Sequence, residues 1–300
     1  MGGKHHYHAF PSADAKAGAP GADMNNNGPF HLSPKQLDIW NNISRQLHTA
    51  SEIDLFLDYD GTITPIRSTP AEAVLEPETV HVLQQLIQLP HLKVTMVTGR
   101  SMADIQKLVL FKNIGFVANH GFHVLQDGKE WRHPEAERFI KKLRKLYTIL
   151  QGAFQPFPKS FLEDKQFTLS IHYRNVSVQE QTAFKAIARK TIYEFDSRLV
   201  LTEGKEVLEV RPPVDWGKGR AVMEILSAQQ HSPRSLQMYI GDDITDEDAF
   251  QVLQSSGITI HVGNTADTQA HYYVNDVDEV LQILKMIIRL QTHRSNHHPT

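Results

Sequence analysis

The amino-acid sequence predicts an α/β fold: a doubly wound parallel sheet into which a smaller α+β domain is inserted. Short, continuous apolar runs alternate with stretches of helical period between residues 53 and 118, and such runs return between 238 and 274. This rhythm is typical of βαβ units whose strands are buried on both faces. Between these regions the apolar residues alternate with period two, which indicates antiparallel strands. The change of period marks the insertion.

Capping residues and the spacing of apolar residues place the elements of the first half. Ser33, Pro34 and Gln36 suit the first positions of a helix, as a cap, a first-turn proline and a capping partner. A buried strand is expected at 53–57 and a second helix at 77–89. The predicted buried residues of the two helices are Leu37, Trp40, Ile43 and Leu47, then Val80, Leu83, Leu86 and Ile87. Further buried strands are expected at 94–97, 116–118, 238–240, 258–262 and 272–274.

The inserted segment begins with a hairpin that turns at Asp127-Gly128, a dipeptide typical of two-residue loops. Pro212-Pro213 marks the return to the core. Between them we expect a helix at 134–150, a strand at 167–173, a helix at 178–195 and paired strands at 199–202 and 207–210. The predicted organisation is a disordered tail at 1–32, a core at 33–124 and 212–292, an inserted domain at 125–211 and a disordered tail at 293–300.

Composition excludes several classes of function. The formal net charge of -3 gives no reason to expect a nucleic acid or an anionic membrane as partner. The absence of cysteine excludes disulfides and thiolate zinc sites, which fits the cytoplasm. No apolar run is long enough for a membrane span, and the first thirty residues lack the apolar centre of a signal peptide. We therefore expect a cytoplasmic protein.

Asp58 and Asp60 follow the first predicted strand directly, and Gly61 ends that strand. Ligands of open α/β sheets bind in the crevice at the carboxyl ends of the strands, so both acids are expected to project into a site. Two neighbouring acids require a cation, and an aspartate can act as a nucleophile that becomes phosphorylated. The pair therefore predicts phosphoryl transfer.

Polar residues follow three later segments in the same manner. Thr98 precedes a helix that Ser101 can cap, and such a helix start is an anion site. Lys218 stands between two glycines at the start of a helix, and Asp242 begins a run of acids after a strand. Each segment alone has an ordinary explanation, as a helix cap, a solvated lysine or acids that suit a first helical turn. Their occurrence at four successive strand ends favours phosphoryl transfer.

These segments together resemble the four motifs of the haloacid dehalogenase (HAD) superfamily of phosphatases: Asp58-Tyr59-Asp60-Gly61-Thr62, Thr98, Lys218 and Gly241-Asp242-Asp243. The resemblance implies a HAD-like, Rossmannoid core in which Asp58 is the nucleophile. It implies that Asp60 protonates the leaving oxygen and then activates water. It also implies that Thr98 and Lys218 hold the phosphoryl oxygens.

The same resemblance implies Mg²⁺ as the cofactor. The implied ligands are Asp58, the main-chain oxygen of Asp60, and Asp242. Asp243 and Asp246 are implied as outer-shell supports. The position of the insert, between the Thr98 and Lys218 motifs, is that of a C2-type cap, a domain that chooses the substrate.

Within the superfamily, the cap resembles that of the trehalose-6-phosphate phosphatases. The segments that carry this resemblance are Leu162-Glu163-Asp164-Lys165, Ile171-His172-Tyr173-Arg174, Glu203-Gly204-Lys205 and Leu208-Glu209-Val210-Arg211-Pro212. The resemblance implies Mg²⁺-dependent hydrolysis of trehalose 6-phosphate to trehalose and phosphate through an aspartyl-phosphate. The expected substrate-binding residues are Gly99, Arg100, Asn119, His120, Gly121, Glu163, Lys165, His172, Arg174 and Glu209. Charges on the exposed face of a sheet are also commonly only solvating, which is the ordinary alternative for the cap residues.

One position departs from the family pattern. Many relatives carry an acid one residue after the Asn-His-Gly segment, where this chain has His123. The departure leaves room for another glycosyl phosphate, such as sucrose 6-phosphate or glucosylglycerol phosphate, or is an unimportant substitution. A mutase on the same scaffold is a further alternative, because such enzymes share the chemistry of the core. The rivals from other classes are a receiver-like signalling domain and an inactive sugar-phosphate sensor. Asp60 speaks against a receiver, because a second acid makes a phosphoaspartate short-lived.

Overall fold

The structure is a computed structural model that describes residues 34–204, 206–229, 232, 234–263 and 267–295. The predicted tail at 1–32 and the cap residue Ser33 lie outside these residues, as do the side chains of Gln36 and Leu37. Of the predicted tail at 293–300, the first three residues continue the last helix, and the others are outside the described range. No helix in the described part of the chain is long and apolar enough to cross a membrane.

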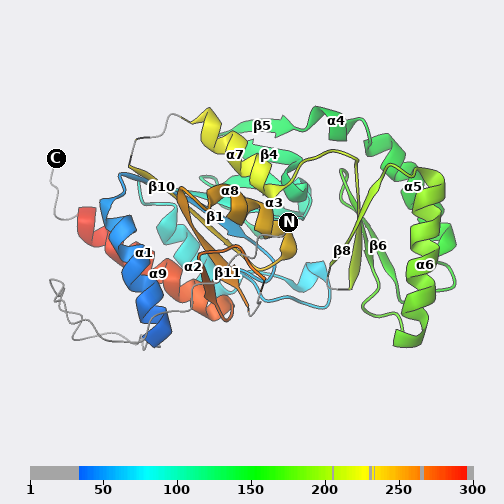
Figure 1. The fold of residues 1–300 in the computed structure, drawn as a ribbon, viewed down its shortest axis with the longest axis horizontal. Helices are drawn as coiled ribbons and strands as arrows, with labels where there is room; N and C mark the ends of the chain where they lie inside the picture. Colours follow the sequence, from blue (N-terminus) through cyan, green and yellow to red (C-terminus); the bar gives the residue numbers. More distant parts are fainter. Residues whose placement is uncertain (1–33, 205, 230–231, 233, 264–266, 296–300) are drawn as a thin grey trace, which may run out of the picture. The chain divides into compact units, whose positions relative to one another are not determined.

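A large sheet has the strand order β12-β11-β10-β1-β2-β3-β4-β5 (Figure 1). The strands from β12 to β3 pair in parallel, and β4 and β5 add an antiparallel hairpin at one edge. This sheet confirms the predicted α/β fold class. Its strands are β1 Glu52–Asp58, β2 Leu92–Val97, β3 Gly115–Ala118, β4 His123–Gln126, β5 Lys129–Arg132, β10 Ser235–Gly241, β11 Gly257–Val262 and β12 Tyr272–Val274.

The direction of strand addition reverses at β1. From β1 the chain adds β2 and β3 on one side, and the later strands β10, β11 and β12 lie on the other. Such a reversal opens a crevice at the carboxyl ends of the two central strands. Asp58 ends β1 and Gly241 ends β10, so the two predicted motifs meet at this crevice.

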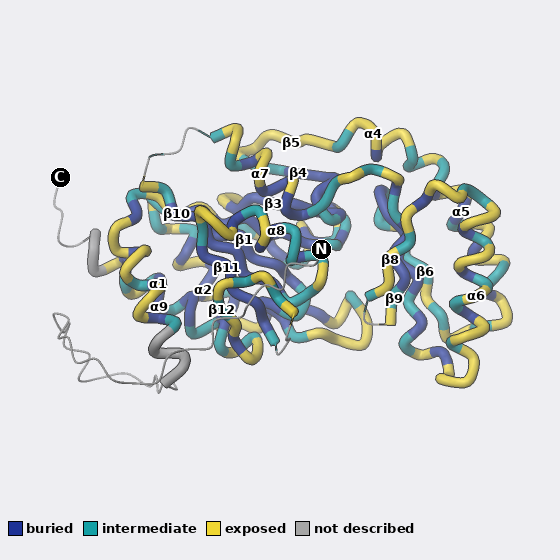
Figure 2. Tube along the Cα trace, in the orientation of Figure 1, coloured by how far each residue is buried: buried dark blue, intermediate teal, exposed yellow. Residues whose placement is uncertain are grey.

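Helices cover both faces of the large sheet. On one face α7 and α8 bury a cluster that includes Phe56 of β1 and Tyr239 of β10, while α1 and α2 both pack against α9. Figure 2 shows the strands buried between helices whose outer sides are exposed. The helices are α1 Pro34–Thr49, α2 Pro77–Leu86, α3 Met102–Leu108, α7 Lys218–Ala228, α8 Glu247–Leu253 and α9 Val277–Ser295, with short 3-10 turns η1 Pro70–Glu72, η2 Asn119–Gly121 and η3 Ile244–Asp246.

The predicted buried stripes are confirmed in α1 and partly wrong in α2. Trp40, Ile43 and Leu47 are buried as expected. In α2 the buried residues are Thr79, Val82, Leu83 and Leu86, whereas Val80 and Ile87 are only half-buried. The reason is that α2 ends at Leu86, so Ile87 is its cap and not part of the stripe.

A second sheet has the antiparallel order β6-β7-β9-β8. Helices α5 and α6 cover one of its faces (Figure 1) through a cluster that includes Ile171, Leu208 and Phe184. Its elements are α5 Ile140–Ala153, β6 Phe161–Asp164, β7 Leu169–His172, α6 Val178–Phe195, β8 Val200–Gly204 and β9 Val207–Arg211. The predicted boundary at residue 125 falls inside β4, which belongs to the large sheet.

The single helix predicted at 134–150 is wrong, because two helices occupy this range. The short α4, Pro134–Glu137, is capped by His133, and α5 begins after Phe139. Ala136 of α4 packs into a small cluster with Phe122 and Phe167, whereas α5 packs on the second sheet. The helix breaks between these two packing surfaces.

Aromatic residues join the two sheets. Phe122, just before β4, stacks on Phe167, just before β7, with ring centroids 6.3 Å apart. Trp216, just before α7, donates a hydrogen bond from its indole to the main-chain oxygen of Gly121 at 2.8 Å. Its ring also lies 5.4 Å from that of Trp131 on β5. The second sheet is therefore anchored next to the start of α7, where Lys218 lies.

Candidate active site

Asp58 has its carboxylate buried at the reversal point of the large sheet. Oδ1 accepts a hydrogen bond from Nζ of Lys218 at 2.7 Å, and Oδ2 accepts one from the hydroxyl of Thr62 at 3.3 Å. Burial raises the pKa of Asp58 well above its usual value. The charge of Lys218 opposes this shift, whereas the charges of Asp246 and Asp242 add to it. A carboxylate that is only partly neutralised is suited to accept a further cation.

Lys218 is the first residue of α7, and its side chain is 2% exposed. Its Nζ donates to Oδ1 of Asp58 at 2.7 Å and to Oδ1 of Asp246 at 2.8 Å. Asp246 also accepts hydrogen bonds from the hydroxyl of Tyr239 at 2.6 Å and from the amide of Asp243 at 3.0 Å. Burial alone would lower the pKa of Lys218, but the charges of Asp246 and Asp58 raise it above its usual value. Lys218 is therefore a cation beside the predicted nucleophile.

Three carboxylates lie close enough to share one cation. One oxygen each of Asp58, Asp242 and Asp246 lie within 4.8 Å of one another. Gly61 leaves room for Asp242, because a Cβ atom at this position would lie 2.2 Å from Oδ2 of Asp242. Its φ of +85° also favours glycine. Carboxylate oxygens are the donors that Mg²⁺ prefers. The donor set therefore fits a hard divalent cation, although the oxygens of Asp246 already accept the hydrogen bonds described above.

The carboxylate of Asp60 pairs with the guanidinium of Arg100 and does not belong to the cluster of Asp58, Asp242 and Asp246. Nε and Nη2 of Arg100 donate to the two oxygens of Asp60, both at 2.7 Å. The guanidinium also donates to Asp104 at 2.7 Å and to the main-chain oxygen of Pro70 at 2.8 Å, and it lies over the ring of Tyr59. Such a bidentate pair fixes the orientation of a carboxylate. The structure thus brings Arg100, expected at the substrate, to the predicted general acid.

The loop after β3 brings Asn119 and His120 next to Thr98. The Thr98 hydroxyl accepts a hydrogen bond from the amide of Arg100 at 3.1 Å, and its main-chain oxygen accepts one from the amide of His120 at 3.0 Å. Gly99 packs against the ring of His120. Asn119 and His120 have positive φ of 51° and 54°, which is uncommon for residues other than glycine. Within the described residues, both polar atoms of the Asn119 side chain are buried without a hydrogen-bond partner, so a ligand can use them.

Glu209 of β9 is the centre of a polar cluster on the second sheet. Its carboxylate accepts hydrogen bonds from the hydroxyls of Thr168, at 2.5 Å, and Ser170. Nζ of Lys165 lies 3.6 Å and Nε2 of His120 lies 3.5 Å from its oxygens. Burial alone would raise the pKa of Glu209, but the charge of Lys165 and hydrogen bonds from His120 and Ser170 hold it well below the usual range. Because His120 belongs to the loop after β3, this cluster connects the two sheets.

The other predicted cap residues form two separate pairs. Glu163 of β6 lies 3.1 Å from Nε2 of His172 on β7, a diagonal contact, because Glu163 is paired with Ser170 across the strands. Arg174 pairs with Glu206 at 2.9 Å and donates to the main-chain oxygen of Arg67 at 3.1 Å. Arg67 lies in the segment after β1, so Arg174 contacts the core.

The family model described as Trehalose-phosphatase matches residues 56–278, a range that contains Asp58, Lys218 and Glu209. The chain belongs to the trehalose-phosphatase family. This finding confirms the resemblance predicted from the sequence, and it covers both sheets in one match.

Named relatives agree with this assignment to the trehalose-phosphatases. Trehalose-phosphate phosphatase B of Arabidopsis thaliana is 30% identical over 251 residues, which is 79% of this chain and 66% of the relative. The trehalose-phosphate phosphatase of Mycobacterium tuberculosis (strain H37Rv) is 35% identical over 216 residues, 71% of this chain and 54% of the relative. The solved C-terminal domain of Candida albicans trehalose-6-phosphate phosphatase has a TM-score of 0.70 and 25% identity, over 83% of this chain and 96% of that one. The match therefore leaves a third to almost half of the two curated relatives without a counterpart.

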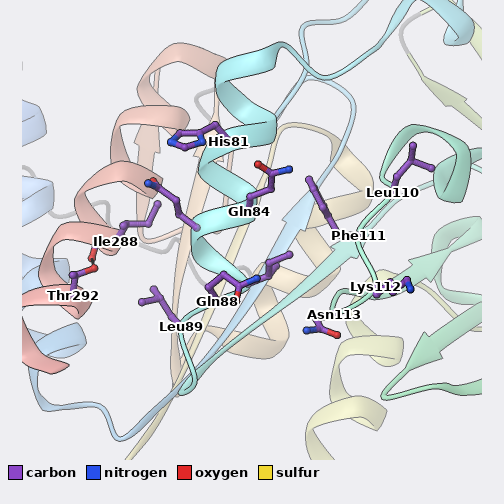
Figure 3. Close-up of a pocket in the computed structure, with 12 residues that line it drawn as sticks. His81, Gln84, Gln88, Leu89, Leu110, Phe111, Lys112, Asn113, Ile288 and Thr292 are labelled. Atoms are coloured by element: carbon purple, nitrogen blue, oxygen red, sulfur yellow. Dashed lines mark hydrogen bonds between the residues drawn. The ribbon is translucent and has the colours of Figure 1, made fainter. Parts of the chain in front are cut away.

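A groove of about 670 Å³ lies elsewhere on the molecule, between α2, α9 and the segment 109–114 before β3 (Figure 3). Its lining residues are His81, Gln84, Gln85, Ile87, Gln88, Leu89, Leu110, Phe111, Lys112, Asn113, Ile288 and Thr292. The segments that precede β2 and β3 form part of it, so the groove is at the amino ends of these strands. Asp58 is at the carboxyl end of β1, so the groove is not part of the candidate active site.

Several polar residues of the site were not singled out by the sequence. Tyr239 lies in an apolar strand, and only its position two residues before Gly241 hints that it reaches Asp246. Ser170 and Thr168 belong to the period-two strand, but their contacts with Glu209 follow from the pairing of β7 with β9. His123, which the sequence did single out, pairs with Glu130 across the hairpin at 2.6 Å and packs against Phe167.

Proposed function

We propose that this chain hydrolyses trehalose 6-phosphate to trehalose and phosphate, with Asp58 as the nucleophile. The observation that carries the proposal is the buried Asp58 at the reversal point of the sheet, with the ammonium of Lys218 2.7 Å from Oδ1. An oxygen of Asp58 forms a bond to phosphorus while the bond from phosphorus to the sugar oxygen breaks. Lys218 and Thr98 bind phosphoryl oxygens and stabilise their charge.

Asp60 supplies the proton transfers in this proposal. It gives a proton to the leaving sugar oxygen, and it later takes a proton from the water that attacks the aspartyl-phosphate. The bidentate pair with Arg100 holds the carboxylate of Asp60 in one orientation, with both distances at 2.7 Å. A fixed orientation lowers the entropic cost of a proton transfer.

We propose Mg²⁺ as the cofactor, held by Asp58, Asp242 and the main-chain oxygen of Asp60. When bound, the cation would neutralise negative charge on the carboxylates and the phosphoryl group. The cluster of Asp58, Asp242 and Asp246 supports this choice. Asp246 acts as an outer support, because its oxygens already receive hydrogen bonds from Lys218 and Tyr239.

The second sheet is proposed to act as the substrate-choosing cap, within the predicted domain 125–211. Glu209 and Lys165 present an acceptor and a donor on its side toward His120, and the side chain of Asn119 adds buried polar atoms without partners within the described residues. Sugar hydroxyls need such paired acceptors and donors. That His123 alters the choice of sugar phosphate stays a prediction.

We propose a cytoplasmic location, because the sequence contains no cysteine.

Phosphate release from a panel of substrates tests the proposal. The panel is trehalose 6-phosphate, sucrose 6-phosphate, glucose 6-phosphate, glucosylglycerol phosphate and an aryl phosphate, each with Mg²⁺. We expect a preference for trehalose 6-phosphate that is lost in Asp58→Asn. Preference for another sugar phosphate would keep the chemistry and overturn the cap assignment. The absence of turnover with every substrate would overturn the proposal that the chain is an enzyme and would favour a sugar-phosphate sensor.

A further inference from the structure

We propose that Asp248, the second residue of α8, is a positioning residue for Lys218. It holds the first turn of α7 through a hydrogen bond to the main chain and thereby fixes where the ammonium of Lys218 lies. The inference deepens the proposed function, because it rests on Lys218 as the residue that holds the phosphoryl group.

The start of α7 lacks a cap of its own. Its N-cap residue is Gly217, which has no side chain to accept hydrogen bonds from the first amides of the helix. Asp248, from a different helix, faces this first turn, because the position of a Cβ atom at Gly217 would be 2.1 Å from Oδ2 of its carboxylate. The proposed cap is a hydrogen bond to this carboxylate from the amide of Gly219, which is also among the groups that affect the pKa of Asp248. The cap therefore binds the residue that follows Lys218 directly.

The two glycines around Lys218 make this contact possible. A Cβ atom at Gly217 would lie 2.1 Å from Oδ2 of Asp248, and one at Gly219 would lie 2.4 Å from its main-chain oxygen. At Gly219 the neighbouring atoms are main chain, so a side chain there would displace α8, whereas at Gly217 it would displace the carboxylate of Asp248. The Gly-Lys-Gly sequence, which suggested close approach to an anion, thus also serves close approach of α8.

The carboxylate of Asp248 is partly buried and not merely solvated. Oδ1 is buried and has no hydrogen-bond partner within the described residues. Buried polar atoms of this kind are uncommon and call for an explanation. The explanation offered here is that the carboxylate is retained for its other contact, at the amide of Gly219.

The segment that leads into α8 therefore holds Lys218 at both ends. Asp246, at the start of α8, accepts a hydrogen bond from Nζ of Lys218 at 2.8 Å, and Asp248 fixes the main chain on the other side. Nζ lies 2.7 Å from Asp58, and a shift of about 1 Å at a catalytic group can lower a rate about 100-fold. Loss of the Asp248 contact is expected to act through this distance.

Steady-state kinetics of three Asp248 variants tests the inference. Asp248→Ala should lower kcat about 10- to 100-fold on trehalose 6-phosphate and on the aryl phosphate, with KM changed less than about 3-fold. Asp248→Asn and Asp248→Ser keep an oxygen acceptor suited to capping, so each should recover most of kcat. Asp215→Asn is the matched control, because this exposed acid lies three residues before α7 along the chain but pairs with Arg220. It should leave kcat unchanged.

A second arm asks whether Asp248 acts through Lys218. In a Lys218→Ala background, Asp248→Ala should cost little further kcat, because the group it positions is gone. An undiminished further loss would overturn the inference, as would wild-type kcat in Asp248→Ala or no recovery in Asp248→Asn. The Asn variant keeps the test usable if the Ala variant does not fold.

Hydrogen exchange separates this inference from the proposed function. Amides of the peptide covering residues 216–222 should exchange faster in Asp248→Ala than in the wild type, and Asp248→Asn should restore their protection. This readout requires no turnover. Unchanged exchange would overturn the positioning role even in an active enzyme, whereas increased exchange in a chain without phosphatase activity would overturn the proposed function alone.

Discussion

Asp58 in the large sheet and Glu209 in the second sheet are both buried carboxylates, but their pKa values shift in opposite directions. Asp58 has Lys218 as a cationic partner and two further acids nearby, and burial raises its pKa well above the usual value. Glu209 is also buried, yet Lys165, His120 and Ser170 hold its pKa well below the usual range. One site has an excess of negative charge, and the other is balanced by donors.

This difference separates the tasks of the two regions. A site that keeps uncompensated acids in a buried place can gain from a cation, and its geometry serves charge movement during a reaction. A site whose carboxylate is fully supplied with donors is rigid and can exchange hydrogen bonds with sugar hydroxyls. We therefore expect substitutions in the large sheet to affect all substrates, and substitutions in the second sheet to affect the choice among them.

The largest expected effect belongs to Asp58→Asn. The amide keeps the size of the side chain but cannot form an aspartyl-phosphate, so kcat should fall about 10⁴-fold or more on every substrate. Isothermal titration with trehalose 6-phosphate should show that affinity changes much less. Residual turnover within about 10-fold of the wild type would remove Asp58 as the nucleophile.

Glu209→Gln should have a smaller and selective effect. A neutral amide loses the charge-assisted contacts with Lys165 and Ser170, so kcat/KM for trehalose 6-phosphate should fall about 10- to 100-fold. The aryl phosphate, which has no sugar, should be turned over almost as in the wild type. Equal losses on both substrates would contradict the division of tasks between the two sheets.

Binding of Mg²⁺ should raise the free energy of unfolding, an effect that can be measured without turnover of substrate. A concentration of about 100 times Kd adds about 2.7 kcal/mol, which corresponds to a rise in Tm of about 4–5 °C for a chain of this size. Differential scanning fluorimetry with Mg²⁺ and with a chelator measures this rise. Asp242→Asn should lose most of it, and Glu209→Gln should keep it. A rise that survives in Asp242→Asn would place the cation elsewhere.

The smallest expected effect is on stability at low pH. The folded pKa of Glu209 lies below the usual value of 4.5, so its contribution is complete above pH 4.5 and is lost as the pH falls below it. Asp58 has the opposite sign, because a raised folded pKa favours the folded state at low pH. The difference in free energy of unfolding between wild type and Glu209→Gln should therefore shrink from pH 6 to pH 3.5, by at most about 1.4 kcal/mol per unit. A constant difference would contradict the low pKa of Glu209.

The large sheet was predictable from the sequence because its signals are local. The run 53–57 is continuously apolar and forms a buried strand, and Ser101 caps α3 as expected. In the second sheet, the hairpin of β8 and β9 and the bounds of α6 agree with the prediction for the same reason. In each case the neighbours that decide the structure lie within a few positions along the chain.

Contacts between distant residues were not predictable in this way. The expectation that Arg100 lies at the substrate stays a prediction, and the sequence did not show that it pairs with Asp60, forty residues earlier. The break between α4 and α5 depends on Ala136 packing against residues from other segments. Such contacts depend on the register and arrangement of the sheets, which periodicity alone does not specify.

The placement of the tryptophans has a spectroscopic consequence. Of the three in the chain, Trp40 is buried in α1, whereas Trp131 and Trp216 contact each other where the two sheets meet. The main-chain oxygen of Trp216 also accepts a hydrogen bond from Arg211, the last residue of β9, at 2.7 Å. Intrinsic fluorescence therefore has a built-in reporter at this junction. A change in emission when substrate is added would record a rearrangement there without any attached dye.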